Sequence, residues 1–129
     1  MRKALYSALV LVAMCSSAHA GDFDGSRLLI CAPVEVKDCE AGSHCVAATP
    51  ADVGTPSFVR IDFDRKLLVG PKSESPIRVY EKTDQQILMM GSEQGFGWTV
   101  VLDQQSGEIS ATIADRNGAF VLFGSCTPI

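Results

Sequence analysis

The chain has 129 residues and carries more acidic than basic side chains, 15 Asp and Glu against 11 Lys and Arg, for a formal net charge of −4. This balance argues against a nucleic-acid partner, because binding to phosphates draws most of its affinity from clustered Lys and Arg. Beyond the N-terminal segment, no run approaches the roughly 20 continuous apolar residues of a membrane-spanning helix. We therefore expect no membrane span after processing.

The N-terminal segment has the three parts of a secretory signal peptide. Arg2 and Lys3 form a positively charged start, an apolar stretch follows, and Ala18-His19-Ala20 is a small-x-small cleavage site. We expect cleavage after Ala20, with residues 1–20 as the signal peptide and residues 21–129 as a single β domain. The segment predicts export, most simply to a bacterial periplasm.

The mature chain is predicted to be one small domain with an acidic surface. Without the signal peptide 109 residues remain, enough for one core and not for two. The signal carries two of the eleven basic residues, so nine remain against fifteen acidic ones and the net charge becomes −6. Such a surface favours a basic protein partner, or it simply keeps the protein in solution. A lipid anchor on Cys15 is disfavoured because Met14, and not a small residue, precedes it.

Short runs of alternating apolar and polar residues, separated by turn residues, predict an all-β protein. No window predicts a helix. An antiparallel sheet in so short a chain has to hide its edges, so we expect a small antiparallel meander that closes into a barrel or a tight sandwich of about eight strands, stapled by disulfides. In chain order, the candidate strands span residues 27–36, 43–49, 57–63, 66–70, 76–82, 85–91, 96–103, 107–114 and 118–125.

Specific turn residues link the predicted strands of the C-terminal half. Asn117-Gly118 predicts a type I′ hairpin, because both residues tolerate the positive φ angles of that turn. Segments 92–95 and 104–107 each end in a glycine suited to the left-handed position of a longer hairpin loop. We expect the last four strands, from residue 85 onward, to form an antiparallel meander.

Four cysteines remain in the predicted mature chain, and they allow three pairings that the sequence alone does not distinguish. We favour Cys31 with Cys126 and Cys39 with Cys45. The first pair would tie the first strand to the last where a barrel closes, and the second would staple a short loop. Both bridges fit an oxidising compartment.

Side chains that ligate metals gather around the same loop, but their spacing is unusual. Cys39, His44 and Cys45 lie close to Glu40, whereas zinc sites usually show Cys-x2-Cys or His-x3-His spacing. The pair Met89-Met90 would suit copper, although neighbouring methionines in an apolar strand are more typical of a core. We expect no metal and no cofactor.

Few residues are available for catalysis. His44 is the one histidine of the predicted mature chain, and no Gly-x-Ser-x-Gly elbow occurs. Two carboxylate pairs, Asp22 with Asp24 and Asp62 with Asp64, have the spacing that places both side chains on one face of a strand. We interpret both pairs as solvated strand ends and expect a protein that is not an enzyme.

Trp98 is the only tryptophan of the chain. In the predicted strand 96–103 it shares a face with Phe96, Val100 and Leu102, and this aromatic face should point inward. Trp98 and Phe96 therefore either fill the core or form the floor of a ligand cavity at the mouth of a barrel, because small barrels do both.

The cysteine in the first predicted strand and the terminal pattern Phe123-Gly124-Ser125-Cys126 resemble small exported bacterial β-barrel proteins of undetermined function. In size, expected architecture and disulfide use, the chain is also similar to the periplasmic lysozyme inhibitors of the C-type class. That resemblance implies a Ser-Gly-x-x-Tyr loop that enters the active site of the lysozyme. Here Ser106-Gly107-Glu108-Ile109-Ser110 lacks the tyrosine, so the similarity concerns the fold alone.

These observations lead to three hypotheses. The first is a non-enzymatic periplasmic protein that engages a basic envelope or host protein, for example as an inhibitor of a lysozyme. The alternative is a carrier of a small apolar ligand in a cavity near Trp98 and Phe96. The third is an enzyme that uses Asp62, Asp64 or His44.

Overall fold

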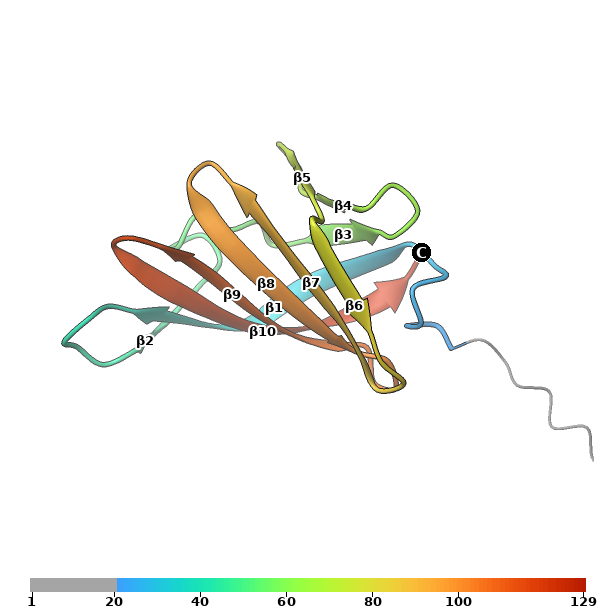
Figure 1. The fold of residues 1–129 in the computed structure, drawn as a ribbon. Coiled ribbons are helices and arrows are strands. Elements are labelled where there is room, and N and C mark those ends of the chain that lie inside the picture. The colour runs from blue at the N-terminus through green and yellow to red at the C-terminus, as the bar shows by residue number, and fades with distance from the viewer. Residues whose placement is uncertain (1–20) are drawn as a thin grey trace, which may run out of the picture.

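The computed structural model describes residues 21–129, so the predicted signal peptide and its cleavage site after Ala20 lie outside the described residues. Residues 21–129 form ten antiparallel β-strands (Figure 1). Within this range no helix is long and apolar enough to cross a membrane. The strands are β1 (Leu29–Cys39), β2 (Val46–Ala48), β3 (Val59–Asp62), β4 (Leu67–Val69), β5 (Glu74–Pro76), β6 (Val79–Lys82), β7 (Gln86–Glu93), β8 (Phe96–Asp103), β9 (Glu108–Asp115) and β10 (Gly118–Pro128).

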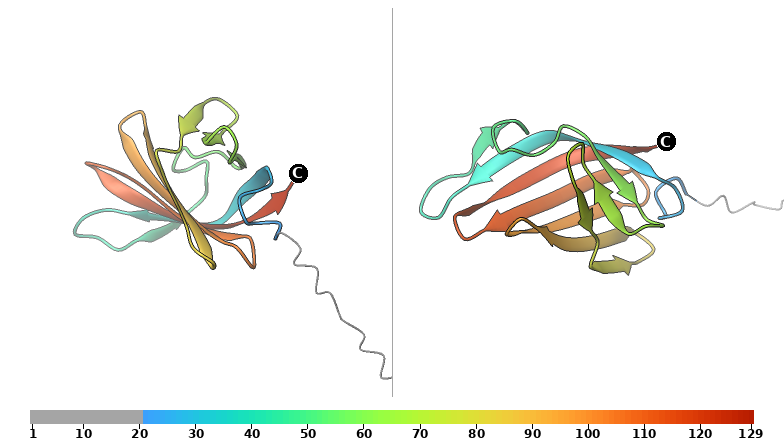
Figure 2. Two further views of the ribbon diagram at one scale, coloured as in Figure 1. Left: turned by 45° about the vertical axis from the view of Figure 1, so that its right-hand side comes forward. Right: turned by 90° about the horizontal axis from the view of Figure 1, so that it is seen from above.

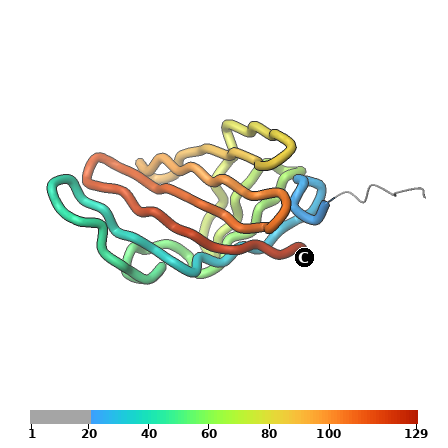
Figure 3. Tube along the Cα trace, turned by 90° about the horizontal axis from the view of Figure 1, so that it is seen from below, coloured from blue at the N-terminus to red at the C-terminus, as the bar shows by residue number. Residues whose placement is uncertain are grey.

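All ten strands belong to one strongly curled sheet, ordered β5-β4-β3-β1-β10-β9-β8-β7-β6, with β2 added beside β1. The two longest strands, β1 and β10, pair in the middle of this order, from Leu29 opposite Pro128 to Cys39 opposite Ala119. Figure 3 shows them side by side from below. The sheet curls so that β3, β4 and β5 lie over its concave face (Figure 2).

The expectation of a closed barrel or tight sandwich of about eight strands is wrong, because the sheet is a curled half-barrel of ten strands. Its two end strands, β5 and β6, are consecutive in the chain, and only Ile77 and Arg78 separate them. The Ile77 amide donates to the carbonyl of Lys66 at 2.8 Å, whereas the Arg78 amide donates to the carbonyl of Met90 at 2.9 Å. The chain thus leaves one end of the sheet and joins the other at this step, which divides the predicted strand 76–82.

The predicted meander is confirmed as β7, β8, β9 and β10, but two of its turns differ from the prediction. Segment 92–95 holds a two-residue turn and not the expected longer loop, with left-handed Gln94 and Gly95 at φ of 49° and 85°. In segment 104–107 the glycine is left-handed as predicted, with φ of 74°. The type I′ prediction for Asn117-Gly118 is wrong, because neither residue has positive φ. The carboxylate of Asp115 accepts hydrogen bonds from the amides of both residues, at 2.8 and 3.2 Å, and holds the turn instead.

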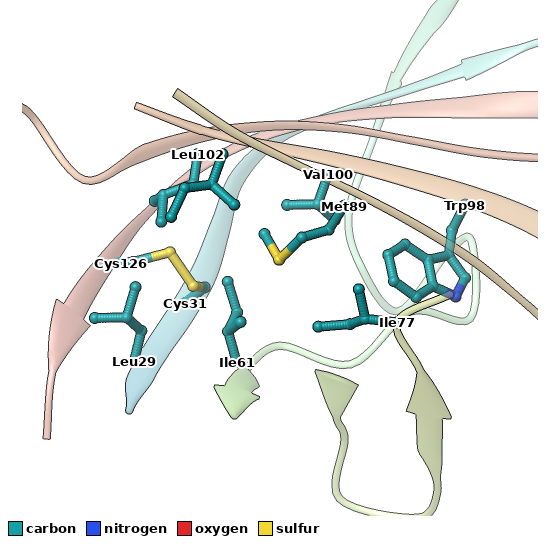
Figure 4. Close-up of a cluster of buried hydrophobic side chains, with 10 residues drawn as sticks. Leu29, Cys31, Ile61, Ile77, Met89, Trp98, Val100, Leu102 and Cys126 are labelled. Atoms are coloured by element: carbon teal, nitrogen blue, oxygen red, sulfur yellow. A yellow bond between two sulfur atoms is a disulfide. The ribbon is translucent and has the colours of Figure 1, made fainter. Parts of the chain in front are cut away.

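The concave face of the sheet carries the core (Figure 4). Alternate residues of the long strands β7, β8 and β9 point to this face, as expected for pleated strands with one buried side. The inward side of β8 is the one that the sequence predicts, since Trp98, Val100 and Leu102 are buried. The largest side chains with almost no exposure are Leu29, Ile61, Ile87, Met89 and Leu102.

The structure contains two disulfide bonds, one between Cys31 and Cys126 and one between Cys39 and Cys45. The first links β1 to β10 inside the core, with 4.0 Å between the two Cα atoms. These strands are neighbours in the middle of the sheet, so the bond does not lie where the half-barrel closes, contrary to the sequence-based expectation. The second links the end of β1 to the loop before β2.

A turn formed by residues 21–27, which we call the N-terminal turn, covers one end of the half-barrel. The ring of Phe23 lies on Gly107, and a side chain at position 107 would collide with it. Gly107 also has φ of 74°, so both space and backbone conformation require glycine there. The ammonium group of Lys82 donates to the carbonyl of Asp24 and ties the turn to β6. This end is therefore filled by the protein itself.

Candidate ligand-binding cavity

A cavity of about 650 Å³ lies toward the opposite end of β8, away from the N-terminal turn. One wall belongs to β8, β9 and β10, and the other to β3 and β4 with the loops at residues 53–56 and 70–73. Pockets for small ligands typically occupy about 300–1,000 Å³ and are mostly apolar. Here the wall from the long strands is built chiefly from Phe96, Trp98, Val100, Ala111, Phe120 and Leu122.

Trp98 is held in one orientation at this wall. Its indole Nε1 donates a 2.8 Å hydrogen bond to the Ser75 hydroxyl, which in turn donates to the carbonyl of Ser92 at 3.4 Å. Trp98 is 8% exposed and Ser75 is 4% exposed. Gly91 pairs with Trp98 across β7 and β8, and a Cβ atom at position 91 would come within 3 Å of the indole. The ring therefore presents an apolar surface whose one polar group is already bonded.

The buried polar side chains of the described residues already have hydrogen-bond partners. In the part of the chain that the structure describes, no buried side-chain nitrogen or oxygen lacks a hydrogen-bond partner. A polar ligand group placed among these buried side chains would thus meet no unsatisfied side-chain partner, and burying a polar group without a hydrogen bond costs free energy. The cavity favours an apolar occupant.

Phe96 and Trp98, the two ligand-binding residues predicted from the sequence, both line the cavity. The sequence missed the opposite wall, including Val53, Pro56 and Pro71. Val53, Pro56 and Pro71 belong to irregular segments without a periodic pattern, so the sequence does not assign them to a wall.

The other candidate site residues do not form a site. His44 is exposed in the loop between β1 and β2, and Asp64 is exposed after β3. Asp62 forms an ion pair with Arg65 at 3.8 Å, and Asp22 forms one with Arg27 at 2.8 Å. Across residues 21–129, no group of three or more His, Cys, Asp or Glu is placed to hold a metal ion. Met89 is buried and Met90 is exposed on the opposite face of β7.

The shifted pKa values belong to turns and to the N-terminal end, not to the cavity. Hydrogen bonds from Ser26 lower the pKa of Asp24, those from Thr49 lower the pKa of Asp52, and the amides of Ser106 and Gln105 lower that of Asp103. Burial, and secondly the nearby charge of Asp24, raises the pKa of Tyr80. None of these four groups lines the cavity, so their shifts reflect local structure and carry no acid or base role there.

A second feature is the projecting hairpin, which we define as residues 39–48. Figure 1 shows it extending beyond the body of the sheet. Residues 40–47 are all exposed, and Val46 retains 57% of its accessible surface. The disulfide between Cys39 and Cys45 closes its tip. A cross-link that fixes an exposed loop without covering core lowers the entropy that the loop would lose on binding a partner.

The chain matches no protein-family model, no curated protein and no solved structure. The class that the geometry defines is a disulfide-linked, curled antiparallel β-sheet with one filled end and an apolar cavity. Function therefore has to be argued from the cavity and the projecting hairpin.

Proposed function

We propose that this protein binds a small apolar ligand in the cavity beside Trp98 and that it does so as a carrier, not as an enzyme. One observation supports this above all: a space of about 650 Å³ remains beside a fixed indole and behind mostly apolar walls. A concave, mostly apolar space of this size lies within the range typical of small-ligand sites. Export to the periplasm is part of the proposal, and both disulfides support it.

Trp98 fluorescence provides a direct test, because the chain has no other tryptophan. Titration with a neutral naphthylamine dye should quench this fluorescence in a saturable way. Ala111 lines the cavity from β9, and the Ala111→Phe variant should fill part of the space and weaken dye binding at least tenfold.

Ala114 offers a matched control on the same strand. It is exposed and does not line the cavity, so Ala114→Phe should bind the dye like the unchanged protein. Equal binding by both variants, each with an unchanged circular dichroism spectrum, would place the dye elsewhere and refute the proposal.

Binding of a basic protein is the second candidate function, and the exposed, cross-linked projecting hairpin favours it. The acidic charge of the mature chain supports attraction to a basic partner such as a lysozyme. The Ser106-Gly107 segment is less suited to enter an active site, since Gly107 is buried beneath Phe23. If the hairpin engages a lysozyme, Glu40→Lys should weaken inhibition, whereas Glu108→Lys on another part of the sheet should affect it less. If a lysozyme keeps its full activity in the presence of an excess of this protein, inhibition of that lysozyme is excluded.

A further inference from the structure

The charged groups of the cavity belong to two neighbouring segments at its edge. Among the described residues that line the cavity, Lys72 is the one cation and Glu93 is the one anion. Lys72 is exposed between β4 and β5, and Glu93 is half-buried at the end of β7. These segments meet at the hydrogen bond between Ser75 and Ser92. Neither charged group forms an ion pair within residues 21–129.

Below this edge, β8 lines the cavity over several residues. The lining residues of that strand run from Phe96 to Val100, four residue steps, which correspond to about 13 Å of strand. Cys31 and Ile61 line the deeper part, and both are buried core residues. This mostly apolar lining suits a chain of methylene groups.

We infer that the ligand is a single-chain lipid with a zwitterionic head, bound with its alkyl chain along β8 and its head beside Lys72 and Glu93. This inference rests on the proposed function and specifies its ligand class. An alkyl chain fills a long apolar space without needing hydrogen bonds. A head with both charges finds a partner for each, whereas a head of one sign faces a like charge at Lys72 or Glu93.

The test uses octyl, decyl and dodecyl phosphocholine below their micellar concentrations, with Trp98 fluorescence and calorimetry as readouts. Affinity should rise about fourfold for each added methylene, because burial of one methylene contributes about 0.8 kcal/mol. Ala111→Phe should reduce this gain, and Ala114→Phe should leave it unchanged.

The position of the head is tested with decyl chains that carry a phosphocholine, a sulfate or a trimethylammonium head. Glu93→Gln should shift the preference toward the sulfate severalfold, and Lys72→Gln should shift it toward the trimethylammonium head. The controls Glu108→Gln and Lys37→Gln remove the same charges from residues that do not line the cavity. They should leave the order of preference unchanged.

Each outcome discriminates between the two proposals. If the naphthylamine dye binds but alkyl affinity does not depend on chain length, the single-chain inference is overturned and the proposed function stands. If affinity depends on chain length but neither Lys72→Gln nor Glu93→Gln changes the preference among heads, the head does not lie beside these residues and the assigned orientation of the lipid is wrong. If neither the dye nor any alkyl compound changes Trp98 fluorescence or produces heat, both proposals fall.

Discussion

The two ends of the curled sheet are built from the same strands and differ in what fills them. At one end, the N-terminal turn places Phe23 on Gly107, beneath which the core continues through Leu102 and Leu29. At the other end, Phe96 and Trp98 face a cavity. A curled sheet of this kind has two apolar ends. In this chain the side chain of Phe23 covers one end, and the other end holds the cavity.

The two ends are also held in place by different interactions. The filled end relies on apolar packing and on a hydrogen-bonded turn at Asp103. The cavity end relies on the hydrogen bond between Trp98 and Ser75, with Gly91 making room for the indole.

The largest effect should come from the disulfide that lies between the two ends. Replacing Cys31 and Cys126 with Ala should lower the free energy of unfolding by about 4 to 5 kcal/mol, because the bond closes a loop between residues 95 apart in the chain. The same change at Cys39 and Cys45, which are 6 apart, should cost about 2 kcal/mol. Urea unfolding measures both. Equal losses would contradict the chain-entropy explanation.

Opening the filled end should have the next largest effect. Phe23→Ala should destabilise the protein by about 2 kcal/mol, somewhat less than truncation of a fully buried phenylalanine, because Phe23 is only half-buried. Phe123→Ala is the matched control, since that ring is 41% exposed, and it should cost less than 1 kcal/mol. If both variants unfold at the same urea concentration, Phe23 does not close this end.

A smaller loss is expected at the cavity wall. Ser75→Ala removes the partner of the Trp98 indole and leaves a buried N–H group unsatisfied, which should cost about 1 to 2 kcal/mol. The Trp98 emission maximum and the dye affinity should change together, because the indole is then free to turn. Ser125→Ala is the control, because Ser125 is exposed on β10 and does not line the cavity. A Ser75→Ala variant that loses stability but binds the dye normally would show that the bond does not shape the cavity.

The sequence predicts most strands because their signal is local. Strand 96–103 has the same bounds in the structure as in the prediction, since alternation and flanking glycines define it without reference to the rest of the chain. The inward position of Trp98 follows from the same alternation. Disulfide bonds are also confirmed, and they join the favoured pairs Cys31–Cys126 and Cys39–Cys45.

What the sequence does not predict depends on contacts between distant segments. The step at Ile77 and Arg78 exists because their amides bond to opposite ends of the sheet, which no local pattern reveals. Gly118 looks like a turn glycine, yet its role is to let the backbone approach Cys39, whose carbonyl lies 2.8 Å from the place of a Cβ atom. The second cavity wall was missed for the same reason, because its loops line the cavity only where the fold places them opposite β8.

The smallest predicted effect concerns pH and the filled end. The amides of Ser106 and Gln105 donate to the Asp103 carboxylate at 2.9 and 2.8 Å and lower its pKa. The charged carboxylate therefore stabilises the turn at pH values above the ordinary Asp pKa of about 3.9. That contribution is lost as the pH falls through the lower pKa of the folded state. Asp103→Asn should therefore differ from the unchanged protein in urea unfolding at neutral pH, and the difference should shrink in acid. A difference that is the same at both pH values would show that the turn does not depend on the carboxylate charge.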